Sequence, residues 1–251
     1  MMREELVFGP IKSRRLGSSL GINLLPTKGK LCNFDCIYCE CGWNKDGEGD
    51  RKLPTSAELE KALREKLSAC KAEGTPIDSI TFSGDGEPTL NPDFAEIIDI
   101  TVSLRDEFYP EAKVSVLSNA TKVGRPSVFE ALRKVDNPIL KIDAPTAALA
   151  LKINQPRCEY DVESIVRDLE KFEGDFVLQT IFLQSPEFDS SSPEVLEGWM
   201  QIVRHLRPRE IMVYTIDRET PMKGLKKFTV EEMTLLLKPL LEEGFKIQIK
   251  G

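Results

Sequence analysis

The sequence predicts an α/β fold, and more narrowly a partial (βα)6 barrel. Two observations lead to this prediction. Short apolar runs alternate with longer segments of helical periodicity almost from end to end of the 251 residues. Six such strand–helix pairs precede a last stretch that alternates apolar and polar residues. Repeated βα units favour a parallel sheet with right-handed crossovers, so the sheet curls one way, and six units make only part of a closed barrel.

The strands are expected where apolar runs are short and flanked by turn residues. The run at residues 176–183 is apolar nearly throughout, as in a sheet that is covered on both faces. Phe245, Ile247 and Ile249 alternate with polar residues, which predicts a half-exposed final strand. The expected strands are residues 20–25, 79–82, 113–117, 138–142, 176–183, 211–216 and 245–250.

The helices are expected from capping residues and from apolar positions three and four apart. Thr55 with Glu58, and Thr229 with Glu232, have the spacing of capping boxes. Cys70 falls on the apolar stripe of the first helix, which predicts a buried structural thiol. Pro239 is expected to kink the last helix. The expected helices run from Thr55 to Gly74, from Asn91 past Thr101, over residues 126–135, 162–169 and 193–206, and from Thr229 onward.

Composition and charge narrow the class of protein. Apolar residues make up 41% and charged residues 30% of the chain, as in an ordinary water-soluble protein. The net charge of −7 argues against a broad basic surface for nucleic acid, although it allows a local basic pocket. No apolar run approaches the roughly 18 residues of a membrane span. The charged opening residues 1–6 contain no apolar leader segment. We therefore expect one domain over residues 1–251, with no membrane contact.

Three cysteines lie close together in the segment CNFDCIYC, residues 32–39. Cys32, Cys36 and Cys39 have C-x3-C-x2-C spacing, which suits three corners of a [4Fe–4S] cluster and leaves one iron open. Zinc is an alternative, but a structural zinc site usually needs a second ligand pair further on. A disulfide framework is the other, but it suits small secreted chains. Six cysteines without a leader indicate a reducing cytoplasm.

This octapeptide resembles the signature of the radical S-adenosylmethionine (radical SAM) superfamily, whose fold is also a partial (βα)6 barrel. The aromatic residue before the third cysteine, here Tyr38, is typical of it. The resemblance implies an iron–sulfur oxidoreductase whose open iron binds S-adenosylmethionine. It also implies reductive cleavage of that cofactor to a 5′-deoxyadenosyl radical, which takes a hydrogen atom from a substrate. A low-potential electron donor such as flavodoxin or ferredoxin is the implied partner.

Polar residues follow the expected strands, where parallel α/β folds bind ligands. The loop at residues 83–90 contains Gly84, Gly86 and Glu87, and it resembles the superfamily's GGE element, which contacts the amino group of the cofactor's methionine moiety. Asp85 separates the two glycines, which is a departure from the plain pattern. An ordinary βα turn is the alternative interpretation.

Other strand ends carry further candidates. Ser118, Asn119, Lys141 and Asp143 suit the ribose hydroxyls or the carboxylate of the cofactor, or else turn and capping roles. Gln179 and Thr180 are polar residues inside an apolar strand, so a ligand-facing role is plausible. The expected cofactor-binding residues are Tyr38, Gly84, Gly86, Glu87, Ser118, Asn119, Asp143 and Gln179.

The substrate is expected across the open face, near Gln179, Asp217 and Arg218. Residues 9–21, which include Arg14 and Arg15, resemble the radical SAM proteins related to wyosine-type tRNA base synthetases, as do residues 83–90 and 214–221. This resemblance implies a tRNA base as substrate. The acidic charge favours a small molecule or a peptide instead, and a non-enzymatic iron–sulfur electron carrier is the third possibility. The role of Cys41 stays open.

Overall fold

The computed structural model describes residues 5–13, 16–27, 29–47 and 52–251. These residues form two compact units. Unit 1 comprises Met1–Cys32, Asn44–Ser118 and Gly124–Pro138, and unit 2 comprises Asn33–Trp43, Asn119–Val123 and Ile139–Gly251. The expected arginine pair, Arg14 and Arg15, lies outside the described residues.

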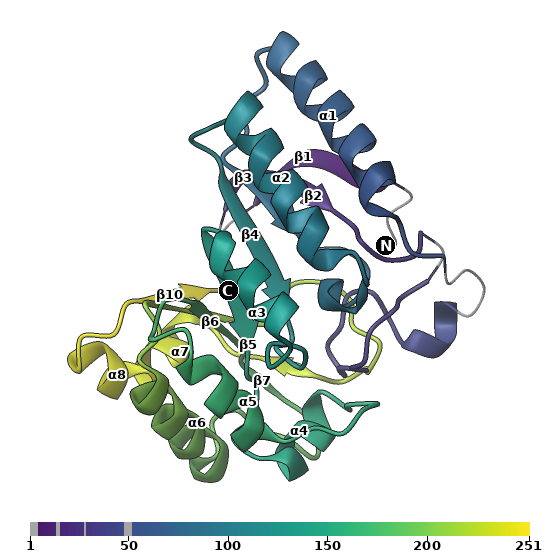
Figure 1. Ribbon diagram of the computed structural model, residues 1–251. Coiled ribbons are helices and arrows are strands. Elements are labelled where there is room, and N and C mark those ends of the chain that lie inside the picture. Colours follow the sequence, from purple (N-terminus) through teal and green to yellow (C-terminus); the bar gives the residue numbers. More distant parts are fainter. Residues whose placement is uncertain (1–4, 14–15, 28, 48–51) are drawn as a thin grey trace. The chain divides into compact units, whose positions relative to one another are not determined.

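Unit 1 is a sheet with helices packed along it (Figure 1). Its strands lie in the order β1-β2-β3-β4; β1 is antiparallel to β2, and the other pairs are parallel. The strands are β1 Val7–Ser13, β2 Gly17–Ile22, β3 Ser79–Phe82 and β4 Lys113–Ser118. The helices are α1 Ser56–Ala72, α2 Phe94–Phe108 and α3 Pro126–Lys134, with short 3-10 turns η1 Asn44–Gly47 and η2 Pro88–Leu90.

The start of the chain differs from the sequence prediction. We expected the first strand over residues 20–25, but β2 ends at Ile22. Asn23 follows it, and its side-chain oxygen accepts hydrogen bonds from the backbone N–H groups of Leu25 and Asp85 and so turns the chain out of the sheet. The antiparallel strand β1 was not predicted, because glycines, a proline and polar residues break any apolar alternation there.

Helix α1 has the predicted capping box. The Thr55 hydroxyl accepts from the backbone N–H of Glu58 at 3.2 Å, and the Glu58 carboxylate accepts from the backbone N–H of Thr55 at 2.9 Å. The predicted apolar stripe is buried, and Cys70 is only 4% exposed, which confirms it as a core thiol.

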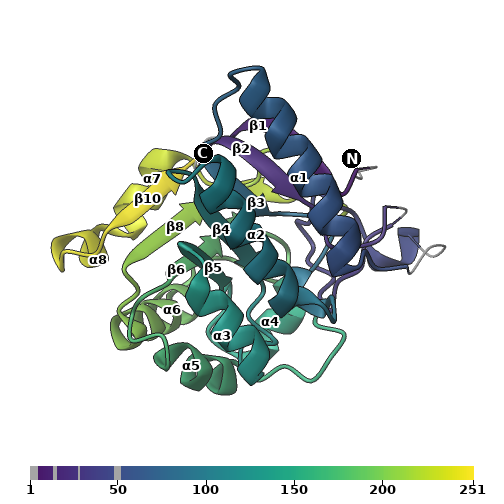
Figure 2. The same cartoon turned by 45° about the horizontal axis from the view of Figure 1, so that its top comes forward.

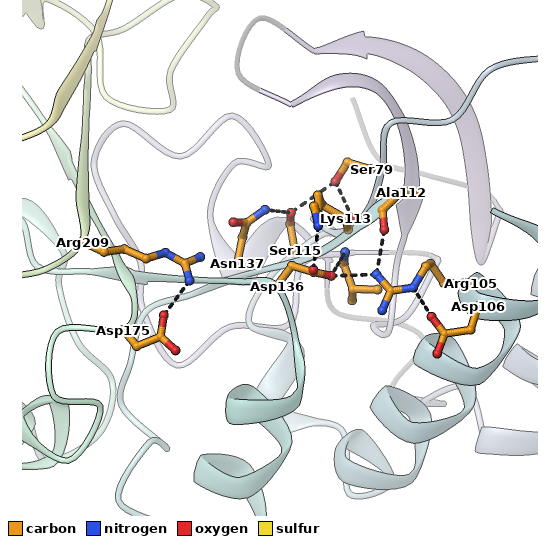
Figure 3. A network of polar contacts seen from close by, with 11 residues as sticks. Ser79, Arg105, Asp106, Ala112, Lys113, Ser115, Asp136, Asn137, Asp175 and Arg209 are labelled. Atoms are coloured by element: carbon orange, nitrogen blue, oxygen red, sulfur yellow. Dashed lines mark hydrogen bonds and ion pairs between the residues drawn. The ribbon is translucent and has the colours of Figure 1, made fainter. Parts of the chain in front are cut away.

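A polar network at the N-terminal ends of β4 and β5 holds strands to helices (Figure 3). One oxygen of Asp136 accepts from Arg105 on α2 at 2.7 Å and from the backbone N–H of Val114 at 2.9 Å. Its other oxygen pairs with Lys113 at 3.3 Å. Burial alone raises the pKa of Asp136, but these three partners outweigh it, so the pKa lies below its ordinary value.

Unit 2 repeats the βα pattern with parallel strands in the order β5-β6-β8-β10. These strands are β5 Asn137–Lys141, which begins in unit 1, β6 Val177–Ile181, β8 Glu210–Tyr214 and β10 Ile247–Lys250; β7 Leu183–Gln184 and β9 Lys226–Lys227 form a small antiparallel pair. The helices are α4 Ala147–Ile153, α5 Val162–Glu170, α6 Pro193–Leu206, α7 Val230–Leu236 and α8 Lys238–Glu242. Figure 2 shows α5 and α6 lying side by side.

Three details of unit 2 correct the prediction. The expected strand at 176–183 is divided into β6 and β7, because the β6–β8 pairing ends at Ile181, while Leu183 and Gln184 pair with β9. Pro239 divides the last helix into α7 and α8 instead of kinking it, since proline cannot supply the hydrogen bond that would continue α7. Helix α4 was not predicted. The final strand is half-exposed, as expected. No helix among the described residues is both long and apolar enough to cross a bilayer.

Candidate functional site

The cysteine loop is a short run of turns. Cys32 ends a segment of unit 1, and its backbone N–H donates to the side-chain oxygen of Asn44 at 2.9 Å. In unit 2 the backbone N–H of Cys39 donates to the carbonyl of Cys36 at 3.1 Å, and that of Gly42 to the carbonyl of Cys39 at 3.0 Å. Cys36 is buried, whereas Cys32 and Cys39 are half-exposed, and all are free thiols.

The C-terminal end of α4 supports this loop through backbone hydrogen bonds. The N–H of Ile37 donates to the carbonyl of Ile153 at 3.0 Å, and the N–H of Asp35 donates to the carbonyl of Asn154 at 3.0 Å. Two residues before Asp35, the carbonyl of Asn33 accepts from the N–H of Arg157 at 2.8 Å. The loop therefore lies along α4 and the residues after it almost as a strand would, and it gives the last carbonyls of the helix the partners that they lack within it.

Asp143 is the centre of a buried polar network in unit 2. It follows β5 and its side chain is fully buried. One oxygen accepts from Tyr38 at 2.5 Å and from the amide of Asn154 at 2.7 Å. The other accepts from the backbone N–H of Ile181 at 3.0 Å and pairs with Lys141 at 3.2 Å. Every polar edge of the carboxylate thus has a donor, which is what burial of a charge requires.

Lys141 supplies the positive charge of this network. Its ammonium donates to the hydroxyl of Tyr214 at 2.6 Å and lies over the rings of Tyr214 and Tyr38. Burial alone would lower the pKa of Lys141, but Asp143 and then Tyr214 outweigh it, so the pKa lies above its ordinary value. The group is therefore a fixed cation that balances Asp143.

The thiol of Cys36 borders this network. The amide nitrogen of Asn154 lies 3.5 Å from its sulfur. Burial, then the neighbouring Cys39 and Asp143, raise the pKa of Cys36 to about 11. The metal-free thiol is therefore protonated at neutral pH, and a metal bound there must displace that proton.

The glycine–acid loop of unit 1 lies against the segment that leads to Cys32. The backbone N–H of Leu31 donates to the carbonyl of Asp85 at 3.0 Å, and the N–H of Glu87 donates to the carbonyl of Leu31 at 3.1 Å. Gly86 has a φ of +145°, and a Cβ there would stand 1.8 Å from the Leu31 carbonyl oxygen. A Cβ on Gly84 would likewise stand 2.1 Å from the side-chain oxygen of Asn23. Both positions therefore need glycine, because a side chain there would collide with the neighbouring segment of the same chain.

Glu87 is held by its own loop and by the end of β4. It is 2% exposed, and one carboxylate oxygen accepts from the backbone and the hydroxyl of Thr89, at 3.1 and 2.6 Å. The same oxygen accepts from the hydroxyl of Ser118 at 2.8 Å. The structure thus brings together two of the predicted residues, Glu87 and Ser118.

The other predicted residues have varied surroundings. Asn119 donates to Asn33 at 2.7 Å, beside the cysteines, and accepts from Thr121. The Gln179 side chain is buried and makes no hydrogen bond to the described residues. Arg218 is exposed and pairs with Glu40 at 2.9 Å, directly after Cys39. Thr180 serves packing instead, since its hydroxyl bonds to the Ile142 carbonyl and to Trp199.

Sequence reasoning missed Asn154, and it named Lys141 only as one of several polar residues at strand ends that could contact the cofactor. A signal for Asn154 was available. An apolar run, residues 147–153, is followed by Asn154, Gln155 and Pro156, and asparagine and proline are common just past a helix C-terminus. For Lys141 the sequence shows only a strand end, and its partner Tyr214 is 73 positions away.

The cysteine chemistry agrees with the predicted cluster. In the described part of the chain no three ligating side chains converge around a single metal ion. A cubic cluster instead takes one thiolate for each of several irons. Three free cysteines in a preformed loop, with an amide N–H aimed at one sulfur, fit such a group.

Comparison with known proteins identifies the family. The family model of the radical SAM superfamily matches residues 27–171, which is more than half of the chain. A UPF0026 protein of Helicobacter pylori is 30% identical over 97% of this chain and 76% of its own length.

Solved structures show the same fold. Streptococcus suis SuiB bound to S-adenosylmethionine has a TM-score of 0.65 at 16% identity, over 89% of this chain and 49% of that one, so our chain spans about half of SuiB. TYW1 with a lysine–pyruvate adduct bound has a TM-score of 0.63 at 17% identity, over 92% of this chain and 76% of that one. The predicted α/β partial barrel is confirmed, and the radical SAM superfamily implies a [4Fe–4S] cluster and S-adenosylmethionine. The chain belongs to the radical SAM superfamily and, within it, to the family of the UPF0026 proteins.

Proposed function

We propose that the chain is a radical SAM enzyme in which Cys32, Cys36 and Cys39 ligate a [4Fe–4S] cluster. The observation that carries the proposal is the C-x3-C-x2-C loop, held in unit 2 by α4, in a member of this superfamily. Bound there, the cluster supplies one electron for reductive cleavage of S-adenosylmethionine. The 5′-deoxyadenosyl radical from this cleavage would take a hydrogen atom from a substrate not yet identified.

We assign S-adenosylmethionine to the strand-end residues. Glu87, with Ser118 and Thr89 fixing one of its oxygens, is a carboxylate suited to an ammonium group. The Gln179 amide, with no side-chain partner among the described residues, suits a polar edge of the cofactor. Tyr38 is held by Asp143 and so keeps a fixed ring beside Cys39. The proposed set is Tyr38, Gly84, Gly86, Glu87, Ser118, Asn119, Asp143 and Gln179.

Three further parts belong to this proposal. The chain acts as one radical SAM domain over residues 1–251. Its electrons come from a low-potential donor of the flavodoxin or ferredoxin kind. It works in the cytoplasm, which its six free cysteines support.

The test is anaerobic reconstitution with iron and sulfide, followed by dithionite and S-adenosylmethionine, with 5′-deoxyadenosine as the measured product. The wild type is expected to form it, and Cys36→Ala to lose both cluster and product. Cys70→Ala is the matched control, because that thiol lies in the core of unit 1 on α1. A wild type that carries a full cluster and yields no 5′-deoxyadenosine would leave an iron–sulfur electron carrier.

One observation favours an RNA substrate over a peptide or a small metabolite. The segment after β8 is joined to the cysteine loop, since the backbone N–H of Met222 donates to the carbonyl of Ile37 at 3.2 Å. This segment is basic in an acidic chain: residues 217–227 hold four cations and two carboxylates. Lys226 and Lys227 are both exposed. Exposed cations on a segment that is joined to the cysteine loop suit a phosphate backbone.

Binding of unmodified tRNA as a function of salt tests this substrate class. We expect affinity to fall steeply with salt and to weaken in a Lys226→Ala, Lys227→Ala double variant. Lys61→Ala with Lys66→Ala, on α1 of unit 1, is the matched control. Equal tRNA binding by wild type and the Lys226, Lys227 variant would favour a peptide or small molecule.

A further inference from the structure

One side chain contacts both a proposed cluster cysteine and the charged network behind it. The amide nitrogen of Asn154 lies 2.7 Å from an Asp143 oxygen, 3.2 Å from the Tyr38 hydroxyl and 3.5 Å from the Cys36 sulfur. An amide nitrogen has two hydrogens. One goes to Asp143, and the other is shared between Tyr38 and Cys36. Asn154 is 1% exposed, so water does not compete for these contacts.

The backbone of Asn154 is fixed on both sides. Its N–H donates to the carbonyl of Ala150 at 2.7 Å, at the end of α4, and its carbonyl accepts from Asp35 inside the cysteine loop. The next residue, Gln155, has a φ of +44°, an uncommon conformation for a residue with a side chain, and its carbonyl also accepts from Asp35. The amide is therefore carried on a rigid support that the cysteine loop itself helps to form.

Charge on the sulfur decides where the shared hydrogen points. Hydrogen bonds to an ionised acceptor are roughly twice as strong as those between neutral groups. Tyr38 already donates its own proton to Asp143, and its hydroxyl stays a neutral acceptor. When Cys36 loses its proton to become a ligand, its sulfur becomes the better acceptor for the shared N–H.

We propose that Asn154 is a positioning residue for the cluster and that its N–H to Cys36 raises the cluster's reduction potential. This inference rests on the proposed function, because it requires Cys36 as a ligand. Reduction adds negative charge, which an N–H donor at a ligand sulfur stabilises, and hydrogen bonds to the sulfurs are among the factors that set such potentials. The carbonyl groups at the C-terminal end of α4 carry partial negative charge, which lowers the reduction potential. The N–H of Asn154 offsets this effect.

The experiment measures the potential in the absence of S-adenosylmethionine. Reconstituted wild type and Asn154→Leu are titrated with reductant, and the reduced cluster is followed by electron paramagnetic resonance. Leucine has a similar size and no donor. We expect a roughly tenfold shift of the reduction equilibrium toward the oxidised cluster, or about 59 mV for one electron. Asn137→Leu is the matched control, because its amide bonds to Ser115 in unit 1, and its potential should equal that of wild type.

A second measurement uses the wild type, so it does not depend on how the leucine variant folds. In protein labelled with ¹⁵N at asparagine side chains, pulsed electron paramagnetic resonance of the reduced cluster should show coupling to a side-chain nitrogen. The coupling should persist in Asn33→Leu, which removes the other asparagine of the cysteine loop; Asn33 contacts Cys158, not a proposed ligand.

The outcomes separate the two proposals. A wild type that binds no cluster overturns the proposed function and this inference with it. A wild type that cleaves S-adenosylmethionine, while Asn154→Leu has an unchanged potential, overturns only the role of Asn154. Absence of nitrogen coupling in the wild-type cluster does the same, whether or not the leucine variant holds a cluster.

Discussion

Two buried carboxylates among the proposed cofactor residues are held in different ways. Glu87, in unit 1, takes two of its hydrogen bonds from Thr89, two residues along the chain, and a third from Ser118. Asp143, in unit 2, is held by Tyr38, Asn154, Ile181 and Lys141, and two of these are 105 and 38 positions away. Two of these three hydrogen bonds to Glu87 thus come from a neighbour in the sequence, whereas the partners of Asp143 come from segments far apart in unit 2.

The two carboxylates also differ in how their negative charge is balanced. Glu87 accepts hydrogen bonds from the neutral Thr89 and Ser118, whereas Asp143 faces a buried ammonium. Loss of a neutral donor costs a hydrogen bond, but loss of one member of a buried ion pair leaves the other charge without compensation. Substitutions in unit 2 should therefore be the more damaging.

Removal of the Asp143 carboxylate should have the largest effect. We expect Asp143→Ala to lower the free energy of unfolding by about 3–5 kcal/mol, because Lys141 would stay buried without its counter-charge. Urea unfolding of the cluster-free protein measures it. The double variant Asp143→Leu with Lys141→Met should lose less than the single one. If the double variant is the less stable of the two, the ion pair does not explain the effect.

Gly86→Ala should follow. A Cβ would meet the Leu31 carbonyl oxygen at 1.8 Å, and the φ of +145° disfavours a side chain, so we expect a loss of roughly 2–4 kcal/mol and poor cluster incorporation. Iron content and urea unfolding are the measurements. Gly74→Ala is the control within unit 1, since its φ is also positive at +68° but nothing lies within 4 Å of a Cβ there. Equal losses would show that the close approach to Leu31 carries no weight.

Asp136 extends the comparison to a carboxylate outside the proposed site. Its pKa is lowered in the folded protein, so its stabilisation is complete above the unfolded value near 4 and is lost as pH falls through the folded value. We expect Asp136→Asn to cost about 1–3 kcal/mol at pH 7. The gap to wild type should shrink below about pH 4. A constant gap at pH 7 and pH 3 would contradict this assignment.

Arg218→Ala should have the smallest effect on stability. Arg218 and Glu40 are both exposed, and such pairs contribute about 0–1 kcal/mol. Thermal unfolding and cluster content should therefore match the wild type. A loss of cluster in this variant would show that the segment after β8 is needed to hold the cysteine loop.

The same contrast explains what could be predicted from the sequence. The cysteine spacing, the capping box at Thr55 and the buried stripe that ends at Cys70 depend on neighbours in the sequence, and the sequence is sufficient to predict them. The antiparallel strand β1 depends on tertiary pairing, so local patterns do not show it. For the short helix α4 the local pattern gives only the C-terminal signal at residues 154–156, and not the pairing with the cysteine loop. Asn154 depends on tertiary contacts too, because its proposed role requires that α4 lies against residues 35–37.

The support of the cysteine loop by α4 also bears on how a cofactor would be acquired. In a zinc finger the chain is disordered without metal, and binding must supply the free energy of folding. Here the carbonyls of Ile153 and Asn154 already fix Ile37 and Asp35. The conformational entropy of this part of the loop is lost when unit 2 folds, so cluster affinity is not diminished by ordering it. Assembly then resembles docking into a rigid receptor more than folding around an ion.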